Sequence, residues 1–194
     1  MRRGNKWWVV VVLGSALAGP GTAADEGAML GEEIVAFVRS RMGQRVGGGE
    51  CSDLVVAALE AGGAWVPRGG GGGGEGLDWG DRVEKRSELR PGDVIEFREV
   101  VFIGRRRTTR GVEIYRTEFP QHVAIVERVM DRGRRLVIVH QNAGPATGSE
   151  AERRVVRRDT LVMGDLRPGG VMRFYRPRRG TVASPWGHEA GEVD

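Results

Sequence analysis

The stretch Gly47-Gly48-Gly49-Glu50-Cys51-Ser52-Asp53-Leu54-Val55-Val56-Ala57-Ala58-Leu59 decides the fold, and it holds the only cysteine among the 194 residues. The glycines form a flexible loop that delivers Cys51 to the first turn of an apolar, helix-like segment. A helix N-terminus carries partial positive charge and unpaired N–H groups, and both favour a thiolate. We therefore expect a lowered pKa and a reactive thiol at Cys51. A buried, inert cysteine is the alternative.

Hydrophobic spacing predicts two helices on either side of this loop. Apolar residues of the segment Met29–Met42 recur at helical intervals and give it one face for the core. A second helix is expected from Ser52 to Glu60, ending at Gly62-Gly63.

From Leu89 onward the pattern changes to short β-type runs. The predicted strands are Val94–Phe97, a hairpin of Val100–Ile103 and Val112–Tyr115 around a basic turn, then His122–Val129, Leu136–Gln141, Val155-Val156 and Val171–Tyr175. No helix-sized segment separates these strands, so an antiparallel sheet is expected. Helices followed by antiparallel strands are typical of the α+β class.

The ends of the chain predict export and a single domain. Met1–Lys6 is basic, Trp7–Leu17 is apolar but too short for a membrane span, and Thr22-Ala23-Ala24 offers small residues for cleavage. We interpret residues 1–24 as a signal peptide, with an uncleaved anchor as the alternative. Residues 25–177 form the predicted domain and residues 178–194 a disordered tail. The expected location is periplasmic or extracellular.

Charge gives little reason to expect a nucleic-acid partner. The chain has 30 basic and 26 acidic residues, but Arg2, Arg3 and Lys6 account for most of the excess. We expect no nucleic-acid binding and no stable membrane insertion after cleavage, and the oligomeric state is left open. Export with one cysteine leaves no intramolecular disulfide, and a free thiol in an exported protein needs an explanation such as catalysis.

A cysteine at a helix start followed by histidines on later strands is the layout of a cysteine nucleophile and its base. The order Cys51, then Pro91-Gly92-Asp93-Val94-Ile95-Glu96-Phe97, then His122-Val123-Ala124-Ile125-Val126-Glu127, then His140-Gln141-Asn142 resembles the NlpC/P60 and CHAP group of papain-like cysteine peptidases and amidases. The resemblance covers roughly Gly31 to Tyr175.

The resemblance implies a fold, a reaction and residue roles. It implies a papain-like fold and hydrolysis of amide bonds in peptidoglycan peptides or another peptide substrate, with no cofactor and no metal. Cys51 would be the nucleophile and His122 the base. His140 stands where NlpC/P60 members carry a histidine that orients the base, and Asn142 matches an asparagine of CHAP members.

Two features depart from that pattern. NlpC/P60 members have Asp-Cys-Ser-Gly around the nucleophile, whereas this chain has Glu50-Cys51-Ser52-Asp53. A carboxylate at Asp53 suits the helix dipole but opposes a thiolate if it points toward the sulfur. The segment Arg98–Pro120 is also longer than the link expected between these strands.

Other functions remain open on the same residues. A histidine on a strand is more often structural than catalytic. A non-catalytic, exported cell-wall-binding module is a second hypothesis, supported by Asp53 and by the arginines of the insertion. A metal site formed by Cys51, His122 and His140 is a third, although close-spaced ligand pairs are missing from the sequence.

Strand register decides whether the polar residues can share one site, because side chains alternate between the faces of a sheet. If Asp131-Arg132-Gly133 is a three-residue loop with Gly133 in the left-handed region, His122 faces Asn142 with His140 on the diagonal. A loop of the other parity would put the two histidines on opposite faces. We predict the shared face, with Cys51 approaching His122 from the helix side.

Overall fold

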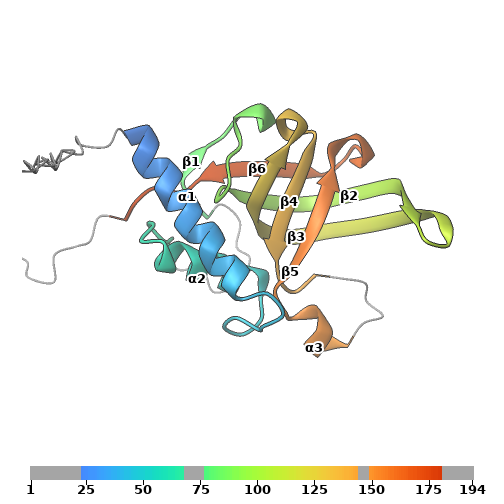
Figure 1. The fold of residues 1–194 in the computed structure, drawn as a ribbon, viewed down its shortest axis with the longest axis horizontal. Coiled ribbons are helices and arrows are strands. Elements are labelled where there is room, and N and C mark those ends of the chain that lie inside the picture. The colour runs from blue at the N-terminus through green and yellow to red at the C-terminus, as the bar shows by residue number, and fades with distance from the viewer. Residues whose placement is uncertain (1–22, 68–76, 144–148, 181–194) are drawn as a thin grey trace, which may run out of the picture.

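A computed structural model of the chain describes residues 23–67, 77–143 and 149–180. The helices are α1 (Ala23–Ser40), α2 (Cys51–Ala61) and α3 (Glu150–Arg153), with short 3-10 turns η1 (Arg86–Glu88), η2 (Asp131–Gly133) and η3 (Met163–Asp165). The strands are β1 (Asp81–Arg82), β2 (Val94–Thr108), β3 (Gly111–Met130), β4 (Arg135–His140), β5 (Arg157–Val162) and β6 (Val171–Arg176). They form one antiparallel sheet in the order β1-β6-β2-β3-β4-β5, with α1 and α2 at its side (Figure 1). The predicted α+β class is confirmed.

Each of the two longer helices begins before its predicted start. Asp25 and Glu26 lie in the first turn of α1, where carboxylates complement the helix dipole, and the helix begins at Ala23 instead of Met29. Cys51 is itself the first residue of α2, one position earlier than predicted.

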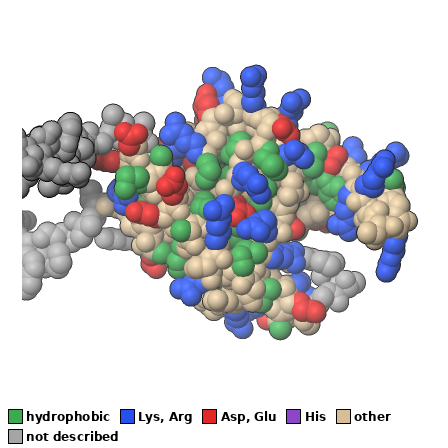
Figure 2. All heavy atoms as spheres, in the orientation of Figure 1, with side chains coloured by type: hydrophobic (Ala, Val, Ile, Leu, Met, Phe, Trp, Pro, Cys, Tyr) green, Lys and Arg blue, Asp and Glu red, His purple; other side chains and the backbone are tan. Residues whose placement is uncertain are grey.

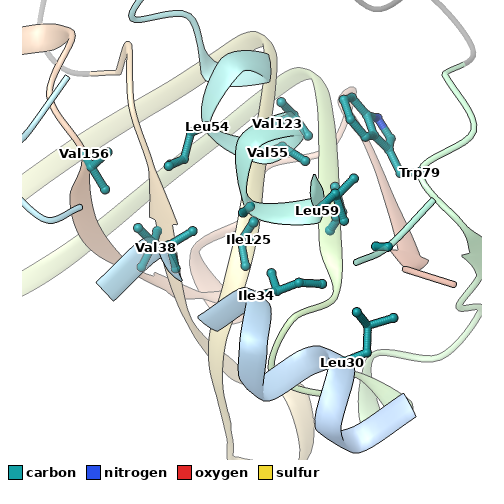
Figure 3. Close-up of a cluster of buried hydrophobic side chains, with 14 residues drawn as sticks. Leu30, Ile34, Val38, Leu54, Val55, Leu59, Trp79, Val123, Ile125 and Val156 are labelled. Atoms are coloured by element: carbon teal, nitrogen blue, oxygen red, sulfur yellow. The ribbon is translucent and has the colours of Figure 1, made fainter. Parts of the chain in front are cut away.

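Both faces of the sheet are covered by apolar side chains. The helix-side core joins Leu30, Ile34 and Val38 of α1 and Leu54, Val55 and Leu59 of α2 to Val123, Ile125 and Val139 of the sheet (Figure 3). A second core lies on the opposite face of the sheet, and we name it the barrel-side core. It contains Ile95, Phe97, Ala124, Val126, Ile138 and Leu161. Because neighbours along a strand point to opposite faces, the central strands are apolar at nearly every position instead of alternating.

The predicted hairpin between Arg98 and Pro120 is part of two long strands. β2 and β3 stay paired from Val94↔Ile125 out to Thr108↔Gly111, so the arginines 105–107 lie in a strand and the turn is at Thr109-Arg110. We call residues 99–120 the arm, because pairing of β2 with β6 ends at Arg98. Figure 2 shows basic side chains gathered toward the free end of the arm.

The predicted strand Val155-Val156 was wrong. The strand begins just after it, at Arg157, and Val156 instead packs into the helix-side core. β5 was not predicted because it begins with the charged residues Arg157-Arg158-Asp159. Its pairing with β4 determines its extended conformation. β5 lies at the edge of the sheet.

The turn between β3 and β4 has a different length from the predicted one, and a bulge compensates. Met130 pairs with Arg135, so the loop has one residue more than predicted, although Gly133 is left-handed as expected (φ 81°). The register then shifts between Val126 and Arg128, so that Val126 pairs with Ile138. The predicted register requires this same pairing. The bulge adds one residue to β3 and so offsets the one additional residue in the turn.

Glu127, the residue at this shift, holds the bulge in place with its carboxylate. Its side chain is only 3% exposed and accepts hydrogen bonds from Arg158 of β5, one of them 2.6 Å long, and from Nε of Arg39 of α1 at 2.6 Å. The bonds from Arg158, followed by those from Arg39, hold the pKa of Glu127 below its usual value although burial opposes this. The bulge is thereby tied to the edge strand and to the first helix.

Several predictions fall wholly or partly outside the described residues. The signal peptide lies there except for Ala23 and Ala24, and so does the glycine run Gly69–Gly74, for which the sequence predicts a flexible loop. Beyond the predicted domain limit at Pro177, the backbone of Trp65 donates to Arg178, and Gly180 donates to Gly63, while the rest of the tail is not described. None of the described helices combines the length and apolar character that crossing a membrane requires.

Replacing Glu127 by glutamine tests the bulge. A glutamine keeps the shape but loses the charge, so we expect the free energy of unfolding at pH 7 to fall by about 1–3 kcal/mol. The folded-state pKa of Glu127 is depressed, so its contribution is present above the ordinary pKa of about 4.3 and is lost as the pH falls through the folded pKa. The difference between wild type and variant should therefore shrink in acid.

Urea unfolding followed by circular dichroism at pH 7 and pH 4 measures both effects. Glu118→Gln is the matched control, because Glu118 lies on the same strand with a half-exposed side chain paired to Arg116. Equal losses for the two variants would contradict a role for Glu127 in the register.

Candidate active site

Cys51 is held at the N-terminus of α2 by its immediate neighbours. Glu50 is the residue before the helix, and its backbone N–H donates to Oδ2 of Asp53 at 3.1 Å. The carboxylate of Asp53, which departs from the NlpC/P60 pattern, thus caps the helix start. A Cβ at Gly47 would lie 2.9 Å from Cβ of Asp53, so the glycine loop fits closely around this cap.

Gln141 anchors the loop that leads to Cys51. Its side chain is fully buried; Nε2 donates to the carbonyls of Val46 (2.9 Å) and Glu50 (2.6 Å), and Oε1 accepts from the N–H of Val46 (3.1 Å). A side-chain amide has both donors and an acceptor. It can therefore pair with the backbone N–H and C=O groups of a loop, as a neighbouring strand would. Gln141 directly follows β4, which places the nucleophile loop relative to the sheet.

The thiol of Cys51 lies where β4 leaves β3. The N–H of Val126 donates to the carbonyl of Asp93, on the side of β3 that faces β2. Because N–H groups point alternately to the two sides of a strand, the N–H of Val123 points toward β4. β4 ends at His140, which leaves that N–H without a ladder partner, and it hydrogen-bonds to Cys51. Cys51 and His122 line a small pocket here, together with Ser52, Leu77, Trp79, Glu96, Gln121 and Val123.

Burial keeps the resting thiol protonated. Desolvation raises the pKa of Cys51 above its ordinary value, and the charge of Glu50 raises it further. The N–H groups of Val123 and Ser52 lower it, but by less. The expectation of a lowered pKa was therefore wrong, because loss of solvent outweighs the helix N-terminus at this site.

Two histidines and an aspartate form a hydrogen-bonded relay. Nε2 of His122 lies 2.8 Å from Nδ1 of His140, and Nε2 of His140 lies 2.9 Å from Oδ2 of Asp159 on β5. His140 is 1% exposed and His122 6% exposed, and the ring of His122 stacks on Phe119 with the centroids 5.2 Å apart. The two histidines share a face of the sheet, as the predicted register requires.

The relay selects the proton positions on both rings. The pKa of Asp159 is lowered, by its hydrogen bond to His140 and by nearby cations although burial opposes this, so its carboxylate is an acceptor. His140 then carries a proton on Nε2 and, when neutral, accepts on Nδ1 from the Nε2–H of His122. Burial, followed by the charges of His140 and Arg157, holds the pKa of His122 well below its usual range. With His140 in this neutral form, Nδ1 of His122 is the unprotonated nitrogen that can take a proton.

The thiol and the relay approach the pocket from opposite faces of the sheet. Val123, which contacts Cys51, belongs to the helix-side core, whereas Phe97, directly opposite His122, belongs to the barrel-side core. Cys51 does approach from the helix side, but the ring of His122 lies beyond β3. Both nevertheless line one pocket together with Val123, next to the end of β4.

Asn142 is not brought to the histidines. It has a left-handed backbone (φ 55°) and its Nδ2 donates to Oε2 of Glu50 at 2.6 Å. Glu50 is also paired with Arg154 at 3.2 Å, so Asn142 belongs to the contacts that fix the start of α2. Within the described ranges, no group of three or more His, Cys, Asp or Glu side chains is placed to hold a metal ion, and Cys51, His122 and His140 form no such group.

Two site residues were missed from the sequence. Gln141 lies inside the quoted His140-Gln141-Asn142 motif. Alternation along the strand puts its side chain on the face opposite to His140, and this could have indicated a contact on the helix side. Asp159 lies in β5, which the sequence did not predict, and only the pairing of β5 with β4 brings it beside His140.

A family model supports the fold described above. Residues 24–185 match the family described as "AIM3/BBC1 Cysteine proteinase-fold domain". Among solved structures, "The crystal structure of Ly7917" matches with a TM-score of 0.44 and 23% sequence identity, over 75% of this chain and 62% of that chain. No curated protein matches the chain.

The pH dependence of thiol alkylation tests the electrostatics of Cys51. Because burial raises its pKa, we expect the alkylation rate with iodoacetamide in the folded protein to reach half of its maximum only above about pH 8.5, the pKa of a free cysteine. Glu50→Gln removes a negative charge beside the sulfur, which favours the thiolate, and should shift the midpoint to lower pH. The same titration in urea supplies the unfolded reference. A folded midpoint below that reference would contradict the assignment.

Removing the Gln141 amide tests the anchor of the nucleophile loop. Gln141→Leu leaves the three backbone groups of Val46 and Glu50 without these partners, so we expect a loss of about 2–3 kcal/mol in stability. Alkylation of Cys51 at a fixed pH should also become faster as the loop loosens. Gln44→Leu is the control, because Gln44 is exposed. Unchanged alkylation and stability in Gln141→Leu would show that the loop holds itself.

Proposed function

The chain belongs to the AIM3/BBC1 cysteine proteinase-fold domain family, and from that premise we propose that it is a cysteine peptidase or amidase. Cys51 is the proposed nucleophile, His122 the base, and His140 and Asp159 the residues that hold the base. The observation that carries the proposal is the relay at 2.8 and 2.9 Å, which leaves Nδ1 of His122 unprotonated beside the pocket of the chain's only cysteine.

The proposed reaction begins with a neutral thiol and a neutral imidazole that meet in the pocket beside Val123. The Sγ proton of Cys51 passes to Nδ1 of His122, and the sulfur forms a bond to the carbonyl carbon of the substrate. N–H groups at the start of α2 are suitable donors to the developing oxyanion. The amine leaves with the proton from His122, and water then hydrolyses the thioester with His122 again as base.

The finer assignment is peptidoglycan peptides as substrate and export as the destination. What supports it is the motif order shared with NlpC/P60 and CHAP enzymes, and the sequence of residues 1–24, which has the pattern of a signal peptide. In this proposal His140 holds the base and Asp159 holds His140, whereas the CHAP-like role of Asn142 is not supported by its contact with Glu50.

A non-catalytic binding module on the same fold is the second candidate. The observation that favours it is the resting electrostatics: the pKa of Cys51 is raised and that of His122 is lowered, so a thiolate–imidazolium pair is disfavoured in the free protein. In this alternative the relay stabilises the barrel-side core and has no catalytic role.

Hydrolysis of cell-wall fragments by purified protein separates the two candidates. We expect release of new amines that is abolished in Cys51→Ala and reduced at least about 100-fold in Asp159→Asn, because the amide no longer fixes the ring protons. Asp131→Asn is the control, since it makes the same change at an aspartate of similar exposure that lies outside the relay and pairs with Arg135. Fragment binding that survives Cys51→Ala, without any release of amines, would assign the binding role instead.

A further inference from the structure

A second cavity lies away from the thiol, between the edge strand β5 and the arm. Its volume is about 330 Å³, within the range of roughly 300–1,000 Å³ that is common for ligand pockets. One wall is formed by four consecutive residues of β5, Asp159–Val162. The other wall includes Phe102, Arg106, Tyr115 and Thr117 of the arm, with Asp165 at one end.

The β5 wall is an open sheet edge. β5 pairs with β4 on one side, and no described strand pairs with its other side. Such an edge presents unpaired N–H and C=O groups, which can bind an extended chain as an additional strand. A run of backbone that faces a cavity instead of bulk solvent is therefore suited to a peptide.

The arm wall is pre-formed. Phe102↔Thr117 and Gly104↔Tyr115 are facing pairs, so these side chains share the inner face of the arm. Tyr115 donates a 2.5 Å hydrogen bond to Asp165, and burial together with that carboxylate raises the pKa of Tyr115 to about 12. Gly104 permits this contact, because a Cβ there would lie 2.2 Å from Oδ2 of Asp165. The wall is thus fixed before any ligand binds.

The chemistry of the lining favours an acidic, partly apolar peptide. Phe102 and Leu161 are 1% and 3% exposed and form an apolar floor. Both acids of the lining are engaged, Asp159 with His140 and Asp165 with Tyr115. Two arginines also line the groove: Arg106 donates from Nε and Nη2 to Glu113 at 3.4 Å with its side chain 65% exposed, and Arg105 has no ion pair among the described residues.

From these contacts we propose that the groove between β5 and the arm binds an extended peptide of a partner protein. The peptide adds to the open edge of β5, an aliphatic side chain packs on the half-buried Tyr115 and Val162 above that floor, and a carboxylate pairs with Arg106. This site goes beyond the proposed hydrolysis, and it does not use Cys51.

Fluorescence anisotropy with labelled octapeptides tests the site in the full chain carrying Cys51→Ala, which prevents cleavage. The probe alternates valine and glutamate, and its counterpart alternates valine and lysine. We expect the lysine peptide to bind at least about fivefold more weakly, as expected from the loss of one exposed ion pair. N-methylation of every second backbone nitrogen gives two further probes. One is methylated at the odd-numbered residues and the other at the even-numbered residues, and we call these the two phases. One phase should weaken binding about tenfold and the other should not, because a single edge of the peptide pairs with β5.

Two protein variants locate the site. Arg106→Glu, on the inner face of the arm, should weaken binding about fivefold, whereas Arg107→Glu makes the same charge change on the outer face and should have less than a twofold effect at 0.15 M salt. Thr117→Trp should fill the groove and remove binding. Equal binding of both methylated phases, or equal effects of the two arginine variants, would overturn the proposal. Binding that appears only after removal of residues 181–194 would assign the groove to the chain's own tail and also overturn it.

Discussion

The buried carboxylate of Glu127, held by arginines from β5 and α1, is the interaction on which the geometry of the molecule depends. It stabilises the one extra residue on β3 that offsets the longer turn before β4. Without that residue, every side chain of β3 beyond the bulge would change faces relative to β4. His122 would then leave His140, and Val123 would exchange its place against the helices. The Glu127 ion pairs therefore help to set which side chains of β3 lie beside His140.

The site also illustrates a competition between two opposing electrostatic effects. Helix termini and free N–H groups favour a thiolate, and Cys51 has both, from α2 and from Val123. Removal of solvent favours the neutral thiol, and it outweighs them here. The same burial keeps His122 neutral, with the nearby charges of His140 and Arg157 acting in the same direction. In the proposed reaction, the thiol proton transfers when substrate and imidazole meet it, and not before.

Much of the fold follows from sequence patterns whose cause is local. The stripes of α1 and α2, the left-handed Gly133 and the strands around His122 and His140 could all be predicted, because periodicity and glycine conformations are properties of short segments. The position of Cys51 at a helix start was also accessible. Asp159 was not, since the strand that carries it begins with charged residues and exists because β4 offers it a partner. Likewise the turn length and the bulge were individually unpredictable, although their combined register was foreseen. The thiol pKa was mispredicted because burial arises from the assembled core and not from the helix alone.

The relay ends at Asp159, on the far side of the sheet from the thiol pocket, and about two fifths of that side chain is in contact with solvent (43%). In the proposed reaction, a proton taken from sulfur therefore has a hydrogen-bonded route to solvent through the two imidazoles and Asp159.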